Sequence, residues 1–188
     1  MARLDPVPQA ARRWSTRAWL WLLRRTFGRE LRPYPVLAHA PKVVGNVLLM
    51  NVLFERGDWT LPVELRKLVH LRVATVIGCE FCKDILSAAG RKHGAGRKVD
   101  DIASSSTAPA FTDRERAALD YAEMVTVSPS DISDAQFADL RRWFSDREVV
   151  ELTAQASFEG FRARLARSLR IEADGFAALP PEQLPSAL

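Results

Sequence analysis

Apolar residues recur at helical spacing along almost the whole chain, and no segment shows the alternation typical of a half-buried strand. The segment 62–77 is an example, because one helix face would carry Leu65, Leu68, Val69, Val73 and Val76. A chain of 188 residues is also long enough to bury a core without disulfide support. We therefore predict an all-α fold in one domain spanning residues 1–188.

Glycines and prolines divide this pattern into helices. Gly28 is placed to end the first helix, Pro62 suits the first turn of another, and Gly78 interrupts the pattern before the next. An irregular lead containing Pro6 and Pro8 precedes them. We expect helices over about 10–27, 43–54, 62–77, 79–94, 112–127, 133–144 and 145–169, with a short helix around 99–104.

Three of these helices begin with a capping box, in which a hydroxyl and a carboxylate or amide satisfy free backbone amides. The pairs are Thr112 with Glu115, Ser133 with Gln136, and Ser145 with Glu148. The stretch "RPYPVLAHAPK" carries three prolines and is expected to be largely irregular. We therefore expect a helical extension over about 1–40 and an irregular tail, extended or mobile, over about 173–188.

The composition is that of an ordinary globular protein, with 47% apolar and 27% charged residues. No apolar run is long enough to span a membrane and no secretory cleavage site is apparent, so we expect a cytoplasmic protein. Much of the net charge of +4 lies in the first helix, where arginines alternate with Trp14, Trp19 and Trp21. This helix is expected to pack its tryptophans on a neighbour or another subunit; binding to a membrane surface is a weaker alternative and nucleic acid is not expected.

Cys79 and Cys82 are the only cysteines, and they form a C-x-x-C pair at the expected start of a helix. Such a pair can cycle between dithiol and disulfide, because free amides and the helix dipole at this position stabilise a thiolate. Lys83 would add to that stabilisation and Glu80 would oppose it. In a cytoplasmic protein an isolated pair of this kind indicates redox or metal chemistry.

Two other interpretations of the cysteines remain open. A structural zinc site needs four ligands, so His70 and His93 would have to complete it, and His93 lies about 16 Å along the helix from Cys82. The two thiols could also be small buried residues without chemistry. We expect no metal and no cofactor.

The chain resembles the carboxymuconolactone decarboxylase and AhpD-like (alkylhydroperoxidase D) family. The resemblance covers roughly residues 40–172, and its specific part is L-R-x-A-x-x-x-G-C-x-x-C within "ELRKLVHLRVATVIGCEFCKDILSAA". It implies an AhpD-like fold of about seven to eight helices, with the C-x-x-C at the start of a central helix. It also implies a homo-oligomer (dimer, trimer or hexamer), and peroxidase or peroxiredoxin-type activity on a hydroperoxide or protein disulfide, supported by a dithiol electron donor.

The chain departs from the resemblance at two positions. Active peroxidases of the family carry a glutamate and a histidine as a proton relay, and the matching positions here are Lys67 and Leu86. His70 lies one turn after Lys67 and is a candidate substitute base, or else a histidine at the edge of the core. Glu151 and Glu159 are further candidates, although solvated surface glutamates are the simpler interpretation, as a charged helix face is for Arg162 and Arg164.

The leading hypothesis is a thiol oxidoreductase in which Cys79 and Cys82 cycle and His70 assists proton transfer. The decarboxylase branch of the family lacks the cysteine pair, so the pair weighs against that activity. The alternative is a non-catalytic or ligand-binding oligomeric member, with inert thiols sealed by Leu86 and Phe81. From helix geometry, Cys79 is expected to be the more exposed thiol, the one that exchanges with an external donor.

Overall fold

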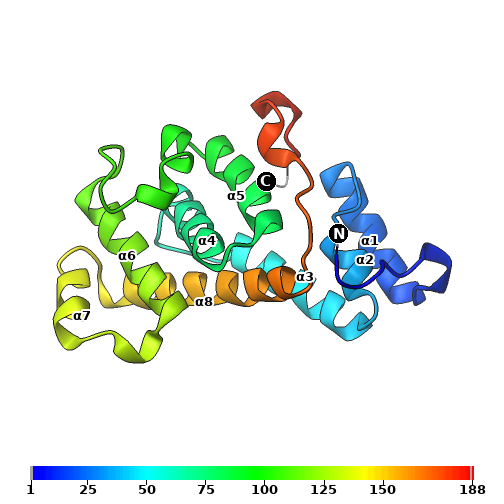
Figure 1. Ribbon diagram of the computed structural model, residues 1–188, viewed down its shortest axis with the longest axis horizontal. Helices are drawn as coiled ribbons and strands as arrows, with labels where there is room; N and C mark the ends of the chain where they lie inside the picture. The colour runs from blue at the N-terminus through cyan, green and yellow to red at the C-terminus, as the bar shows by residue number, and fades with distance from the viewer. Residues whose placement is uncertain (1, 187) are drawn as a thin grey trace.

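The computed structural model describes residues 2–186 and 188. Within that range the chain folds into eight α-helices and several short 3₁₀ turns, without a strand, which confirms the all-α prediction (Figure 1). The helices are α1 (Trp14–Phe27), α2 (Pro33–Leu37), α3 (Pro41–Arg56), α4 (Val63–Ile77), α5 (Glu80–Lys92), α6 (Asp113–Val127), α7 (Asp134–Leu140) and α8 (Asp146–Ser168).

The predicted helix signals act as expected. Thr112, Ser133 and Ser145 each form a complete capping box at the starts of α6, α7 and α8. Gly28 and Gly78 adopt left-handed conformations at the ends of α1 and α4, with φ of 72° and 73°. The break at Gly78 therefore turns the chain from α4 directly into α5.

The proline-rich segment differs from the prediction, because it contains the short helix α2. Pro33 and Pro35 occupy the first turn of α2, where backbone amides have no partner inside the helix, so the missing N–H groups cost nothing. Pro41 begins α3 in the same way, two residues before the expected start. In the opposite direction, α1 begins only at Trp14, since residues 9–11 form a separate 3₁₀ turn.

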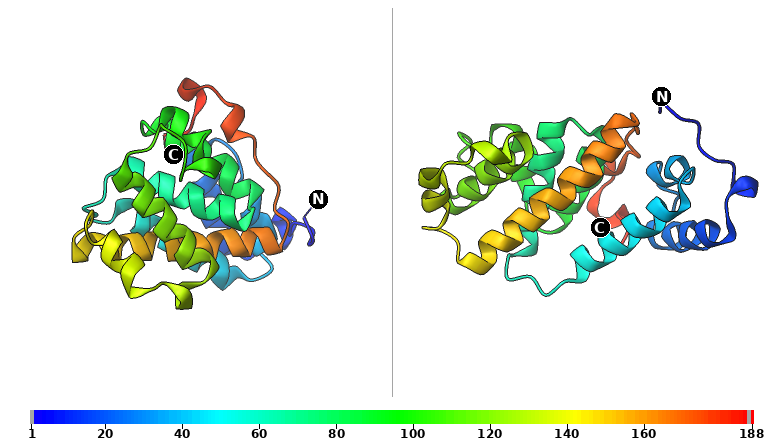
Figure 2. Two further views of the ribbon diagram at one scale, coloured as in Figure 1. Left: turned by 60° about the vertical axis from the view of Figure 1, so that its left-hand side comes forward. Right: turned by 90° about the horizontal axis from the view of Figure 1, so that it is seen from below.

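Two apolar clusters organise the molecule. The larger one surrounds α4, which packs against α5, α6 and α8. The smaller one joins α1, α2 and α3 to the other side of α5 and to the C-terminal segment, through residues such as Leu20, Val44 and Phe176. Figure 2 shows α1–α3 grouped at one end of the molecule, with the C-terminal segment between them and the other helices.

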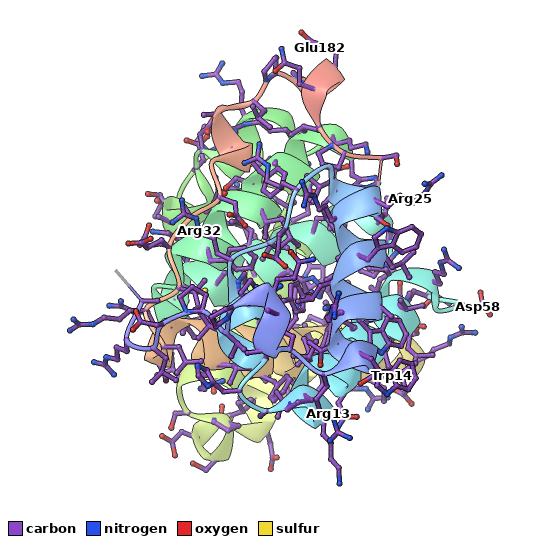
Figure 3. The ribbon with its side chains drawn as sticks, turned by 90° about the vertical axis from the view of Figure 1, so that its right-hand side faces the viewer. Arg13, Trp14, Arg25, Arg32, Asp58 and Glu182 are labelled. Carbon is purple, nitrogen blue, oxygen red and sulfur yellow. The ribbon has the colours of Figure 1, made fainter. Side chains whose placement is uncertain are left out.

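Two of the three tryptophans of α1 do not pack inside the chain as one interpretation of the sequence predicted, whereas Trp19 is 40% exposed. Trp14 is 80% exposed and Trp21 is 63% exposed. In Figure 3 Trp14 and Arg25 project outward from the two ends of α1. Packing of this helix on another subunit stays a prediction. In the described part of the chain, no helix is long and apolar enough to cross a lipid bilayer.

Candidate functional site

The cysteine pair lies at the start of α5, in the interior of the molecule. Cys79 is the N-cap residue, and its Sγ accepts a hydrogen bond from the backbone amide of Cys82 at 3.2 Å. Both thiols are free and buried. The turn at Gly78 thus places two sulfurs next to the unpaired amides of a helix start, where negative charge is stabilised.

The two thiols differ in acidity. Hydrogen bonding from the Cys82 thiol and from its backbone amide lowers the pKa of Cys79, although burial opposes this change. The pKa of Cys82 is raised well above its usual value by its bond to Cys79 and by burial. The first negative charge on the pair therefore belongs to Cys79. Lys83 adds little, because it forms an ion pair with Glu80 at 2.8 Å.

The exposure of the two thiols is the reverse of the prediction. Cys79 is fully buried, whereas Cys82 is 4% exposed and lines a cavity that Cys79 does not reach. The helix-start geometry explains this result, since the N-cap side chain folds back over the first turn of α5. Cys82 is therefore the thiol that a molecule in the cavity would meet.

The cavity has a volume of about 450 Å³ and lies between the α1–α3 group and helices α5 and α8. A volume of this size suits a small organic molecule. Its walls are apolar and come from both sides of the gap, with Phe27, Leu37, Leu48, Ile85, Leu86 and Leu165 among them. The site therefore combines an apolar enclosure with one sulfur.

Charged side chains gather at one end of the cavity, in two ion pairs. Arg162 and Glu159 form the first, with Arg162 Nε 2.8 Å from Glu159 Oε2. Lys67 and Glu55 form the second, with Lys67 Nζ 2.7 Å from Glu55 Oε2. All four residues line the cavity beside Cys82. Within each pair the cation has its own carboxylate, so these four charges are largely balanced.

Glu159 and Glu151 are not the solvated residues that the simpler interpretation predicted. Glu159 is 1% exposed; burial raises its pKa, while Arg162 and the Cys82 thiol oppose part of the rise. Glu151 caps the start of α4 instead, by accepting hydrogen bonds from the backbone amides of Thr60 and Leu61. The sequence does hold a signal for Glu159, because it falls on the same helix stripe as Leu152, Ala156, Ala163 and Ala166.

Arg162 is likewise buried among partners rather than on a charged helix face. Its Nη1 donates to Asn51 Oδ1 at 2.7 Å, and its Nη2 approaches His70 Nδ1 at 3.4 Å. A guanidinium only donates hydrogen bonds, so each atom facing it must be an acceptor. Its neighbour Arg164 plays no part in this network and donates to the carbonyl of Thr126 at 2.6 Å.

Because Arg162 can only donate hydrogen bonds, its contact with His70 fixes the tautomer of the ring. Nδ1 accepts from Arg162, so Nε2 carries the hydrogen and donates to Gln155 Oε1 at 2.7 Å. Burial, together with Arg162 and Lys67, lowers the pKa of His70 well below its usual value, so the ring is neutral. His70 is not among the residues that line the cavity, and both of its nitrogens are engaged. Any effect of His70 on Cys82 must pass through Arg162.

The positions of the family relay have other roles in this chain. Lys67 is held by Glu55, and Leu86 contributes to the apolar wall. Three polar residues of the site were missed from the sequence: Tyr34, Asn51 and Glu55. Asn51 and Glu55 lie four residues apart on α3, a spacing that places both on one face and could have suggested them. Tyr34 lies in the segment expected to be irregular, and no sequence signal pointed to it.

Comparison with known proteins gives one family and one fold. Residues 47–124 match the carboxymuconolactone decarboxylase family. YnjA, an uncharacterized protein of Escherichia coli K12, is 32% identical over 164 residues, which cover 87% of this chain and 90% of YnjA.

Two solved structures have the same fold. An uncharacterized peroxidase-related protein of Ralstonia eutropha JMP134, with an alkylhydroperoxidase AhpD core, superposes with a TM-score of 0.83 at 21% identity over 98% of both chains. A cysteine-to-alanine variant of the debrominase Bmp8, in complex with 2,3,4-tribromopyrrole, superposes with a TM-score of 0.75 at 18% identity over 95% of this chain and 96% of its own.

Proposed function

The chain belongs to the carboxymuconolactone decarboxylase family of AhpD-like proteins, and from this premise we propose that it is a C-x-x-C thiol oxidoreductase with peroxidase activity. The observation that carries the proposal is a free cysteine pair at a helix start with one sulfur, that of Cys82, lining an apolar cavity. A bound hydroperoxide would lie against this sulfur with its organic part along the walls. The fold supports such a ligand, since the debrominase binds a small brominated ring.

The proposed reaction begins with a proton transfer between the two sulfurs. Cys82 passes its proton to the Cys79 thiolate and attacks the terminal peroxide oxygen. An S–O bond forms, the O–O bond breaks, and the organic part leaves as an alkoxide that must take up a proton. The peroxide has then gained two electrons, and Cys82 has become a sulfenic acid.

The second step forms the disulfide. The Cys79 sulfur attacks the Cys82 sulfur, an S–S bond replaces the S–O bond, and the hydroxyl leaves as water with the Cys79 proton. An external dithiol then reduces the pair by two exchange reactions and becomes a disulfide itself. In this scheme His70 is a positioning residue, because it reaches the site only by holding Arg162. We also propose that the protein forms a homo-oligomer, as the family resemblance implies.

The test follows each thiol after one addition of cumene hydroperoxide to the reduced protein. The wild type is expected to lose both thiols to an internal disulfide, read by peptide mass spectrometry. Cys82→Ser should not react. Cys79→Ser lacks the thiolate that takes the Cys82 proton, so it should react more slowly than the wild type and stop at a sulfenic acid on Cys82, which dimedone traps. Trapping on Cys79 instead, in Cys82→Ser, would reverse the assignment of the attacking sulfur.

The alternative function is that of a non-catalytic, ligand-binding member of the family. Its support is the pair of substitutions Lys67 and Leu86, together with a cavity that could hold an apolar ligand without chemistry. Under that alternative the wild type keeps both thiols in the same experiment, even with excess peroxide. The two functions therefore differ in a single mass measurement.

A further inference from the structure

Helix α2 brings a phenol to the cavity that Cys82 lines. Tyr34 is 7% exposed, and its side chain lines the cavity together with Cys82 and Arg162. It comes from the part of the chain before residues 47–124, the segment that matches the family. The site therefore has a polar group that the matched segment does not supply.

The hydrogen-bond network determines what Tyr34 can offer. Arg162 donates to Asn51 Oδ1, so the amide nitrogen of Asn51 must point the other way. That nitrogen donates to the Tyr34 hydroxyl oxygen at 3.1 Å. Tyr34 is thus an acceptor in this contact, and its own hydrogen remains to be donated. No acceptor for that hydrogen is found among the residues that the structure describes.

A buried donor without an acceptor is costly, and a ligand in the cavity would provide one. The oxygen atoms of a hydroperoxide are acceptors, and the oxygen that leaves becomes a strong one as the O–O bond breaks. Donors placed where negative charge develops lower the barrier of such a step. Tyr34 and Cys82 line the same enclosure, and they lie close enough that, in addition to burial, the charge of Cys82 raises the pKa of Tyr34.

We propose that Tyr34 donates the proton to the leaving oxygen. This inference rests on the proposed peroxidase function. In the step, Cys82 sulfur bonds to the terminal oxygen, the O–O bond breaks, and the leaving alkoxide takes the phenol hydrogen to become an alcohol. The phenolate that remains is protonated again from water, so that charge and atoms balance.

The acidity of Tyr34 fits this role. Burial raises its pKa to about 12, so the phenol keeps its proton at neutral pH. It is still a stronger acid than water, whose pKa is about 15.7. It can therefore protonate an alkoxide that is about as basic as hydroxide. A group of this kind assists only when the leaving group is a strong base.

That condition gives the test, which compares two peroxides in the variant Tyr34→Phe. Cumene hydroperoxide releases an alkoxide, whereas peracetic acid releases a carboxylate that needs no proton near neutral pH. The rate of Cys82 oxidation by cumene hydroperoxide is expected to fall by about 10²-fold, the usual contribution of general acid catalysis. The rate with peracetic acid should stay within about twofold, because no proton transfer is lost.

The matched control is Tyr121→Phe, which makes the same change at the only other tyrosine. Tyr121 bonds to Thr153 Oγ1 and does not line the cavity, so neither rate should change. A solvent isotope comparison on the wild type needs no variant: oxidation by cumene hydroperoxide should slow in D₂O relative to oxidation by peracetic acid.

Several results would overturn the inference. Equal losses with both peroxides would mean that Tyr34 only shapes the cavity, and no loss with either would remove it from the reaction. A wild type that reacts with peracetic acid but not with cumene hydroperoxide would overturn the role of Tyr34 while leaving the thiols active. A wild type that reacts with neither would overturn the proposed peroxidase function itself.

Discussion

Arg162 determines which atom each of its polar neighbours presents, because a guanidinium donates hydrogen bonds and accepts none. Glu159, Asn51 and His70 all face it with an acceptor. The charge of Arg162 is compensated by Glu159, and a buried pair of this kind is costly to break from one side only. One residue therefore fixes the amide orientation of Asn51 and the tautomer of His70.

The neutral state of His70 makes stability depend on pH. Its pKa is lowered by burial and by Arg162 and Lys67, with Arg66 contributing least. When the pH falls below about 6.5, the unfolded chain binds a proton at this histidine and the folded chain does not. The stabilisation is fully present above that pH and is lost as the pH falls towards the lowered pKa. The free energy of unfolding should therefore drop by up to about 1.4 kcal/mol per pH unit from this group.

The measurement is urea unfolding at pH 7 and pH 5.5 for the wild type and His70→Gln. The variant should lose less stability between the two values, even if it is less stable at both. His93→Gln is the control. His93 is only partly buried and its pKa is lowered less, so this variant should lose nearly as much stability between the two pH values as the wild type does. An unchanged pH dependence in His70→Gln would show that the folded protein binds a proton at this position.

Local signals in the sequence were sufficient for one part of the site and not for the rest. Cys79, Gly78 and the capping boxes act within a few residues of chain, so their positions could be predicted. Tyr34 and Arg162 are 128 positions apart in the sequence. They line the same cavity only because α2 and α8 both pack around it. Residue spacing does not report that kind of contact, so the polar end of the cavity became apparent only in three dimensions.

At the scale of elements, α5 joins the cysteine pair to the C-terminal segment. Asp84, two residues after Cys82, accepts hydrogen bonds from four successive backbone amides, those of residues 174–177, at 2.8 to 3.0 Å. Gly175 makes the turn possible with a φ of 83°. The tail predicted to be irregular and extended or mobile is therefore bound to α5, and Leu188 reaches the cavity wall.

Asp84→Asn should release this segment. An amide offers one acceptor oxygen in place of two and turns a donor towards the backbone amides, so the hydrogen bonds cannot all be kept. We expect a loss of about 2 kcal/mol of stability and faster amide exchange across residues 174–188. Hydrogen exchange read by mass spectrometry, with urea unfolding, measures both effects.

The control for that variant is Asp100→Asn. Asp100 pairs with Arg91 at the surface, and its side chain is 65% exposed, so its loss should change stability by no more than about 0.5 kcal/mol. If both variants leave exchange in residues 174–188 unchanged, the segment is held by its other contacts, such as Phe176 against Phe27 and the hydrogen bond from Lys92 Nζ to the Pro185 carbonyl at 2.7 Å, rather than by Asp84.

At the scale of the whole molecule, the cavity exists because two apolar clusters meet without filling the space between them. The α1–α3 group supplies one wall and α5 with α8 the other. The gap between the two walls leaves room beside Cys82 for the organic part of a ligand. The size of this gap should therefore select among peroxides.

Val47→Trp tests that selection by filling the gap from α3. Val47 is 6% exposed and lines the cavity. A larger side chain here should lower the rate of Cys82 oxidation by cumene hydroperoxide about 10-fold or more, because the bulky ligand can no longer reach the sulfur in line. Hydrogen peroxide needs almost no room, so its rate should stay within about twofold. Stopped-flow oxidation of the reduced protein gives both rates.

Val150→Trp makes the same substitution on α8 at a side chain that is 68% exposed and lies outside the cavity, and it should change neither rate. Overpacking at Val47 is expected to cost about 1–3 kcal/mol, so the melting temperature is measured first and the rates are taken well below it. If the two peroxides slow equally in Val47→Trp, the substitution has disturbed the cysteine pair. If neither slows, organic peroxides reach Cys82 by a route other than this cavity.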